Sequence, residues 1–247
     1  MRLVIRLHKK SRFNSDKRLS HDFPEQIEAI LKRVIHNYIV SKTSNSETRK
    51  IRSTFCYYST FNQDVLLDNK SYFEITLSLL PGYYKKELLT DILYEQIFIM
   101  GLQGDEYDVV NIKILEKVSL KRGMIYKCIS PIYLPIYNLE NQSVNHKHVE
   151  PFQKEYINKF IQTIVNKRFL MNKEDFEIEE WEEPVFELLS EVKQVRLKEK
   201  YFPENAIAYD FTFKAILPVE LHSIAYYSGF GEQTHLGCGM VEVVDEV

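Results

Sequence analysis

Hydrophobic and polar positions in the first half of the chain follow strand and helix periods in turn. Residues 3–7 are predicted to form a strand, and apolar residues then recur at helical spacing from Ile27 to Tyr38. Pro24 precedes them, and proline is well tolerated in the first turn of a helix, so a helix is predicted to run to about Val40. The other elements predicted in this half are strands over 50–60, 72–80 and 108–118 and a helix over 85–100. The resulting order is β-α-β-β-α-β, the ferredoxin-like order.

The second half repeats this order more loosely. A strand-like segment over 124–136 is interrupted by Pro131 and Pro135, and a helix is predicted over 150–170. Segment 174–187 contains eight acidic residues and the only Trp, which predicts a surface excursion. The remaining predictions are strands over 192–200, 206–217 and 236–244 and a short helix over 218–227. We therefore predict an α+β fold of two tandem ferredoxin-like lobes, residues 1–120 and 121–247, with a glycine-rich loop near the C-terminus.

Composition limits the class of protein. Hydrophobic residues make up 45% of the 247 residues, enough for a sizeable core. No apolar window approaches the roughly 18 residues of a membrane span, and the N-terminus lacks the apolar core of a signal peptide. Cys56, Cys128 and Cys238 form no CxxC pair, which favours free thiols in a reducing compartment. We expect a cytoplasmic protein that makes no membrane contact.

Charge is distributed unevenly along the chain. The net charge of −3 alone argues against nucleic acid as a partner. Residues 1–53, however, contain 13 Lys and Arg against 5 Asp and Glu, whereas the remainder contains 19 against 30. Such asymmetry can give an acidic protein one basic face, with Lys9, Lys10, Lys17 and Arg18 as candidate nucleic-acid contacts. A solvated charged surface is the alternative reading.

Four of the eight glycines lie within eleven residues, in the sequence GFGEQTHLGCG that runs from Gly229 to Gly239. Glycine adopts positive φ and allows close backbone approach, and consecutive N–H groups can then hold phosphate oxygens. The segment is neither a phosphate-binding loop of the Gly-Lys-Ser/Thr type nor a dinucleotide-binding loop, because it precedes a strand instead of opening a helix. The alternative is a tight connection between the last helix and the last strand.

The segment from Tyr226 to Glu242 resembles the C-terminal motif of RAMP proteins, in which G-x-G-x₅-G-x-G follows a helix and precedes a strand. Within that superfamily it is most similar to the CRISPR-associated repeat-processing endoribonucleases of the Cas6 type. Ser130-Pro131-Ile132 resembles the central S-P-[IV] element of that family, and residues 160–169 resemble its second-lobe helix. The resemblance extends over essentially the whole chain, although the region after the first helix is shorter than in many members.

The resemblance implies metal-independent cleavage of precursor CRISPR RNA within its repeats, with no cofactor. A 2′-hydroxyl would attack the adjacent phosphorus and leave a 2′,3′-cyclic phosphate and a 5′-hydroxyl. Gly229, Gly231, His235, Gly237 and Gly239 would then contact RNA. The protein would act as a monomer or homodimer and retain the guide RNA or transfer it to an effector complex.

Histidine suits the proton transfers of this reaction, because its pKa lies near neutrality. On a helical wheel, His36 falls roughly 180° from the apolar stripe, on a basic face, and the resemblance places a catalytic histidine at or just after this helix. Tyr38 and Lys42 are candidates for orientation and charge stabilisation. His21 is the alternative catalytic histidine, roughly 22 Å away if the helix is continuous. An ordinary surface histidine remains the competing interpretation of His36.

Three further interpretations complete the sequence analysis. His146 and His148 form an H-x-H pair, but no carboxylate or thiol partner is suitably spaced, so no metal site is predicted. A non-catalytic RAMP subunit that binds guide RNA within a CRISPR effector complex is the main functional alternative. A ferredoxin-like protein that binds a small molecule is the third, although it leaves the basic N-terminal region unexplained.

Overall fold

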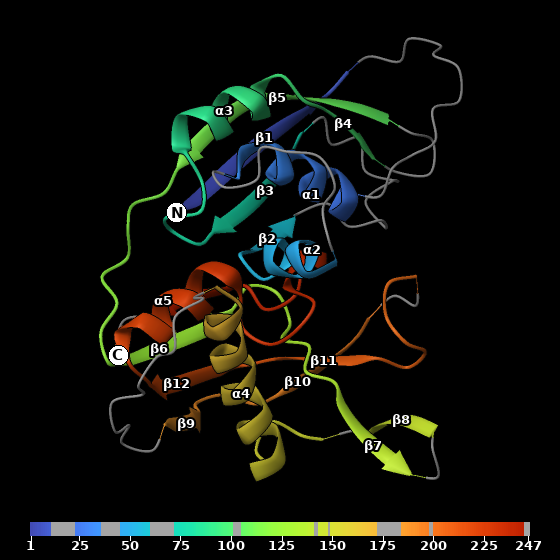
Figure 1. Ribbon diagram of the computed structural model, residues 1–247, viewed down its shortest axis with the longest axis vertical. Coiled ribbons are helices and arrows are strands. Elements are labelled where there is room, and N and C mark those ends of the chain that lie inside the picture. The colour runs from blue at the N-terminus through green and yellow to red at the C-terminus, as the bar shows by residue number, and fades with distance from the viewer. Residues whose placement is uncertain are drawn as a thin grey trace.

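The computed structural model describes residues 1–10, 23–35, 45–59, 72–100, 105–140, 143–147, 149–171, 184–197 and 200–244. It forms two lobes, one above the other in Figure 1. The elements of the first are β1 (Arg2–Lys9), α1 (Phe23–Val34), α2 (Asn45–Arg52), β2 (Phe55–Ser59), β3 (Tyr72–Leu79), α3 (Lys86–Tyr94), β4 (Ile97–Met100) and β5 (Asp105–Ile114). The elements of the second are β6 (Gly123–Cys128), β7 (Ile136–Glu140), β8 (Ser143–Lys147), α4 (Lys154–Met171), β9 (Val185–Leu188), β10 (Lys193–Arg196), β11 (Ile207–Asp210), β12 (Thr212–Ile216), α5 (Val219–Ser228), the 3₁₀ turn η2 (Thr234–Leu236) and β13 (Val241–Val244).

Both lobes contain the same antiparallel sheet. The first has the strand order β2-β3-β1-β5-β4, and the second has β13-β6-β12-β9. Without the additional edge strand β4, each sheet is a β-α-β-β-α-β unit in which the first strand lies between the third and the fourth. The β7–β8 and β10–β11 hairpins are insertions in the second unit. The predicted tandem ferredoxin-like fold is confirmed.

Each lobe has its own hydrophobic core. Alternate residues of β1 (Leu3, Ile5 and Leu7) are fully buried against the apolar stripe of α1, as the two periods predicted. Leu80 belongs to the core of the second lobe, and Val118 and Leu120 pack against that core. The division at residues 120 and 121 stays a prediction, since this connecting segment contacts the second lobe.

Two predicted elements of the first lobe, the strand over 50–60 and the helix over 85–100, are present as β2 and α3 but are shorter than predicted. Residues 50–52 close helix α2 instead of opening a strand, and residues 97–100 form strand β4 instead of ending a helix. Helix α2 has one apolar residue, the buried Ile51, so hydrophobic spacing could not reveal it. The segment Ile-Phe-Ile-Met of β4 pairs with β5 and buries Phe98, and this pairing outweighs the helical spacing of the residues before it.

Three strands of the second lobe are shorter than predicted. The strand expected over 124–136 is β6 alone, before the proline-containing segment 131–135. The strand expected over 206–217 is divided at Phe211 into β11 and β12, which lie in different sheets. The last strand begins at Val241, because the preceding residues belong to the glycine loop. Part of the predicted surface excursion is β9, an edge strand, and residues 172–183 lie outside the described residues.

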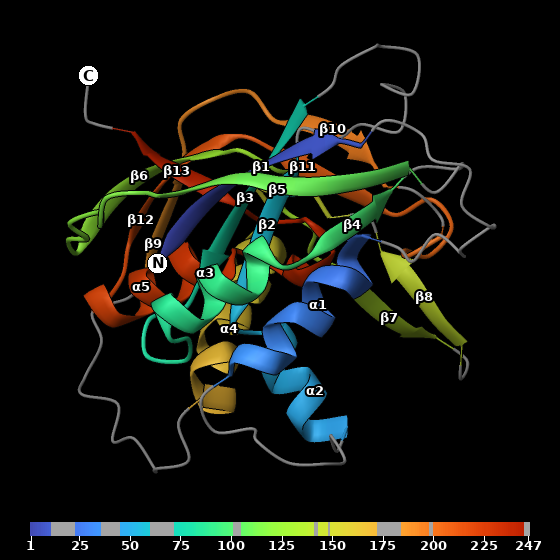
Figure 2. The same cartoon turned by 90° about the horizontal axis from the view of Figure 1, so that it is seen from above.

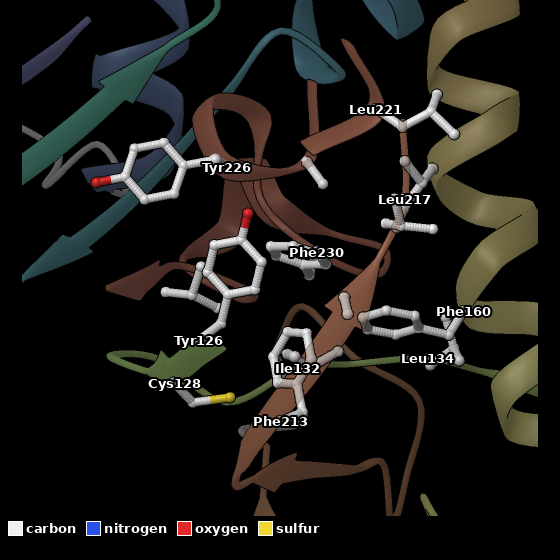
Figure 3. Close-up of a cluster of buried hydrophobic side chains, with 14 of the residues drawn as sticks. Tyr126, Cys128, Ile132, Leu134, Phe160, Phe213, Leu217, Leu221, Tyr226 and Phe230 are labelled. Carbon is white, nitrogen blue, oxygen red and sulfur yellow. The ribbon is translucent and has the colours of Figure 1, made fainter. Parts of the chain in front are cut away.

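A cluster of aromatic rings forms the core of the second lobe (Figure 3). Phe230, which belongs to the glycine loop, is fully buried in it. Its ring centroid lies 5.1 Å from Tyr126, 5.2 Å from Phe213 and 5.4 Å from Phe160. Burial of a phenylalanine side chain stabilises a fold by about 1.5–3 kcal/mol. The loop is therefore anchored to the core by its own side chain.

The glycine loop also joins the two lobes. Thr234 Oγ1 donates a hydrogen bond to the Phe55 carbonyl of β2 (3.1 Å). Beside it, the buried Arg2 guanidinium donates to the Tyr226 carbonyl (2.9 Å) and lies 3.6 Å from the centre of the Tyr226 ring. The helices of both lobes lie on one side of the sheets (Figure 2). The glycine loop is thus held at the lobe junction.

None of the described helices is long and apolar enough to cross a membrane. The three cysteines are buried free thiols.

Candidate RNA-processing site

A pocket of about 730 Å³ opens where the two lobes meet, lined by residues of α2, α4 and the glycine loop. Its walls are mostly polar, which suits a charged ligand better than an apolar one. The lining residues are Thr48, Arg49, Arg52 and Ser53 from α2; Thr163, Asn166, Lys167 and Leu170 from α4; and Gly231 to His235 from the loop. Residues more than one hundred positions apart in the sequence therefore share one cavity.

Helix α2 brings two arginines to the pocket. Arg49 and Arg52 are three residues apart, so they lie one turn apart on neighbouring faces of the helix, and both are exposed. Arg52 Nε donates to Glu28 Oε2 of α1 at 3.0 Å, and Lys32 Nζ contacts the other carboxylate oxygen at 2.9 Å. Burial alone would raise the pKa of Glu28, but the hydrogen bonds from Lys32 and Arg52 outweigh it and lower that pKa.

Helix α4 supplies a buried cation. Thr163, Asn166, Lys167 and Leu170 follow helical spacing, so they form one face towards the pocket. Lys167 Nζ donates to the carbonyl oxygens of Ser228 (3.3 Å) and Gly229 (2.6 Å), at the C-terminal end of α5. Burial lowers the pKa of Lys167 to about 8. At neutral pH the side chain is still mostly charged, and it binds the start of the glycine loop to α4.

All four loop glycines have positive φ, from +75° at Gly239 to +92° at Gly237. The N–H of Gly239 donates to the Pro131 carbonyl (2.9 Å), and the N–H of Gly237 donates to the Thr234 carbonyl (3.2 Å). These two N–H groups therefore bind carbonyl oxygens of the protein itself. The glycine loop thus serves, at least in part, as the tight connection between the last helix and the last strand. Gly231 and His235 line the pocket, whereas Gly229, Gly237 and Gly239 do not.

His235 has an unusual electrostatic environment. Burial, together with the positive charges of Arg52 and Lys167, lowers its pKa to about 4, although Glu28 opposes the shift. The imidazole is therefore neutral at physiological pH. A neutral imidazole can donate or accept one hydrogen bond at each nitrogen, but it does not add a charge to a phosphate site.

The other predicted site residues fall into two groups. His21, His36, Tyr38, Lys42, Lys17 and Arg18 lie outside the described residues. The described helix α1 ends at Val34, so the helical-wheel position of His36 stays a prediction. Lys9 and Lys10 are at the end of β1, where their ammonium groups pair with Asp105 (2.6 Å) and Asp108 (2.9 Å), and neither lines the pocket.

The pocket residues of α2 and α4 were not predicted from the sequence. Arg49 and Arg52 were counted in the basic N-terminal region, but residues 50–52 were assigned to a strand. Lys167 was part of a segment noted for its resemblance to a family helix. The polar face of α4, at positions 163, 166 and 167, is the signal that could have pointed to it.

The remaining histidines have other environments. His222 is fully buried in α5, where Nδ1 contacts the Tyr126 hydroxyl and Nε2 contacts the Arg122 carbonyl, each at 2.8 Å. His146 lies in β8 opposite Tyr137. In the described ranges, no group of three His, Cys, Asp or Glu side chains is arranged to hold a metal ion.

Three solved structures share this architecture over essentially the full length of both chains. A CRISPR-associated Cas6 protein has 19% identity, a TM-score of 0.65 and 99% coverage of both chains. The product of a Cas6-related gene from Pyrococcus furiosus has 17% identity, a TM-score of 0.64, and coverage of 100% of this chain and 99% of its own. A RAMP protein described as binding different RNA substrates has 14% identity, a TM-score of 0.63, and coverage of 99% and 100%. These likenesses concern the fold, and they define it as the two-lobed architecture of tandem ferredoxin-like units.

Sequence comparison gives the family. The C-terminal model of the CRISPR-associated Cas6 family matches residues 114–243, which include α4 and the glycine loop. A CRISPR-associated endoribonuclease-like Cas6 protein from Pyrococcus furiosus is 26% identical over 145 residues, and the match spans 56% of this chain and 55% of that relative. The chain belongs to the Cas6 family.

Proposed function

We propose that this chain is a metal-independent endoribonuclease that cleaves precursor CRISPR RNA within its repeats and yields guide RNAs. The observation that carries the proposal is the pocket at the lobe junction, where Arg49, Arg52 and Lys167 meet the family's glycine loop. Cations in a partly enclosed site stabilise the charge that develops on a phosphorane. Family membership supports RNA as the ligand, and the related protein described as endoribonuclease-like supports cleavage.

In the proposed reaction, the 2′-hydroxyl of the nucleotide before the scissile phosphate attacks phosphorus. One group accepts the 2′-proton, and another protonates the departing 5′-oxygen. We assign one of these two proton transfers to His36, with His21 as the alternative residue. Tyr38 and Lys42 are the proposed orienting and charge-stabilising groups. Arg49 and Arg52 bind the phosphate oxygens, since guanidinium groups match phosphate in a bidentate manner. His235, being neutral, contributes hydrogen bonds only.

The connectivity of the chain supports this assignment. His36, Tyr38 and Lys42 belong to the segment between α1 and α2, and the C-terminal half of α2 lines the pocket. The glycine loop, with Lys9, Lys10, Lys17 and Arg18, would extend the RNA contacts, and the product would remain bound or pass to an effector complex. The chain would act as a monomer or homodimer.

The direct test is cleavage of the cognate repeat RNA by purified protein in EDTA. We expect a single cut within the repeat at a rate unchanged from that in magnesium, because the proposed proton transfers and phosphate contacts need no metal. A CRISPR array beside the gene would supply the sequence of this repeat. A strict magnesium requirement would contradict the mechanism, and tight binding without cleavage would favour the non-catalytic binding subunit.

Neutralising the two pocket arginines should weaken RNA binding and reduce its salt dependence. For single-stranded RNA, each lost phosphate contact reduces the slope of log K against log salt by about 0.7, so the double variant Arg49→Gln/Arg52→Gln should lose about 1.4. Lys9→Gln/Lys10→Gln is the matched comparison and should have a smaller effect, because Asp105 and Asp108 already pair with those ammonium groups. Fluorescence anisotropy between 50 and 200 mM salt measures both quantities. An equal or larger effect of the lysine pair would place the main phosphate contacts on β1.

A further inference from the structure

Helix α1 contains a buried carboxylate that its amphipathic pattern does not require. Glu28 lies among the buried residues of the helix, next to Ile27, and is only 7% exposed. A buried ion pair often contributes less to stability than apolar residues of the same volume would, because both charges lose their hydration. The stability of the core therefore does not explain a carboxylate at this position.

The two oxygens of Glu28 have different partners. Oε1 accepts from Lys32, one turn later in the same helix, and Oε2 accepts from Arg52 of α2. The second contact is made by the Nε of the guanidinium, so the end-on edge, made by the two terminal nitrogens, takes no part in it. That edge presents parallel N–H groups suited to two oxygens of one phosphate. Arg52 lines the pocket, and its side chain is 46% exposed there.

The Glu28–Arg52 contact also joins the two helices that flank the segment 35–44. Glu28 is in α1 and Arg52 is in the last turn of α2, so the ion pair links the helix before the segment that contains His36, Tyr38 and Lys42 to the helix after it. A link between the two helices restricts how they lie relative to one another. One ion pair thus affects both the phosphate-binding arginine and the flanks of the proposed catalytic segment.

We propose that Glu28 is a positioning residue, whose carboxylate holds Arg52 so that its terminal N–H groups bind an RNA phosphate at the lobe junction. The inference rests on the proposed function for the identity of the ligand. Glu28 itself contacts no RNA, since both of its oxygens are occupied by Lys32 and Arg52. It acts on binding and cleavage only through Arg52.

The test is a double-mutant cycle with Glu28→Gln, Arg52→Gln and the double variant, measured on repeat RNA for dissociation constant and single-turnover cleavage. We expect Glu28→Gln to weaken binding about tenfold and to slow cleavage, although the variant is less negative. A general charge effect would instead tighten binding. The double variant should be no worse than Arg52→Gln, because the effect of Glu28 requires Arg52.

Two controls separate positioning from folding and from net charge. Glu74→Gln makes the same charge change in another ion pair, with Arg6 on the first sheet and outside the lobe-junction pocket, and should leave binding and cleavage unchanged. Arg52→Lys keeps Glu28 paired with a cation but removes the guanidinium edge. It should therefore show the same loss of RNA binding, and it provides the test if Glu28→Gln is poorly folded. Glu28→Asp should restore part of the activity.

Several results would overturn the inference. Unchanged or tighter binding by Glu28→Gln would do so, as would additive losses in the double variant or wild-type behaviour of Arg52→Lys. Failure of the proposed function gives a different result. If the wild-type protein binds repeat RNA without cutting it, the proposed cleavage is wrong, but the dissociation constants of the double-mutant cycle still test the role of Glu28. A wild-type protein that binds no repeat RNA would remove both.

Discussion

Replacing His36 with alanine should slow cleavage of repeat RNA by roughly 10²–10⁴-fold, the range expected for loss of a positioned general acid or base. RNA affinity should change little, because binding is distributed over many phosphate contacts. Because the helical wheel predicts a polar-face position for His36, the free energy of unfolding should stay within about 0.5 kcal/mol of the wild type. Single-turnover cleavage, anisotropy and chemical denaturation measure the three quantities.

His21→Ala is the matched comparison for this prediction. If it abolishes cleavage and His36→Ala does not, the reacting histidine is the one before α1. If both variants cleave normally, Tyr38, Lys42 or substrate positioning performs the reaction. His235→Gln serves as a second control. The pKa of His235 is about 4, so its loss should leave the position of any titration between pH 5.5 and 7.5 unchanged.

The second large effect concerns Gly239, where alanine should destabilise the fold by about 3 kcal/mol or more. The residue has φ +75°, which alone costs a side chain about 1–2 kcal/mol. An added Cβ would also overlap the carbonyl oxygen of Phe230, and the backbone there is fixed by the buried Phe230 ring and by the hydrogen bond from its N–H to the Gly239 carbonyl (2.8 Å). Neither the added Cβ nor the Phe230 carbonyl oxygen can move without disturbing the core.

Two other glycines separate the strain of positive φ from the overlap. Gly82 has φ +89° but no atom within 4 Å of an added Cβ, so Gly82→Ala should lose only about 1 kcal/mol. Gly237 has φ +92°, and its added Cβ would lie 3.3 Å from Tyr57 Cε2, which predicts an intermediate loss. Urea denaturation of the three variants gives the order. Similar losses at all three sites would contradict the packing explanation.

The series also changes how a loop substitution should be interpreted. Aspartate at Gly237 or Gly239 is expected to weaken RNA binding, because it adds a side chain and a negative charge to the loop. At Gly239 the same change would first disturb the fold, so lost RNA binding there is informative only in protein shown to be folded. Gly237, which is partly exposed and whose added Cβ would lie 3.3 Å from Tyr57 Cε2 without overlapping backbone, is the better position for that experiment.

The fold was largely accessible from the sequence because its strands and helices bury alternate or helically spaced residues. Leu3, Ile5 and Leu7 show the strand period, and α1 shows the helical one. Helix α2 could not be found in this way, since a short helix of charged residues around Ile51 has almost no apolar pattern. Strand β4 forms because it pairs with β5, and the spacing of apolar residues within β4 gives no information on that pairing.

The candidate site was accessible only in part. The glycine loop and His235 stood out because four glycines are concentrated in eleven residues. Arg52 and Lys167 did not, since an arginine or lysine on a helix is ordinary until tertiary contacts place Glu28 or the Gly229 carbonyl beside it. The roles proposed for His36, Tyr38 and Lys42 rest on the family and on their place between α1 and α2, and they stay predictions.

The measurement that tests the central proposal most directly compares two repeat RNAs in EDTA, one unmodified and one with a single 2′-deoxy nucleotide before the scissile phosphate. Cleavage and binding are followed for both with the wild-type protein. We predict that the unmodified RNA is cut to a 2′,3′-cyclic phosphate and a 5′-hydroxyl, whereas the deoxy RNA binds with similar affinity and stays intact, because the attacking nucleophile is missing. Cleavage of the deoxy RNA at the same position would contradict attack by the 2′-hydroxyl.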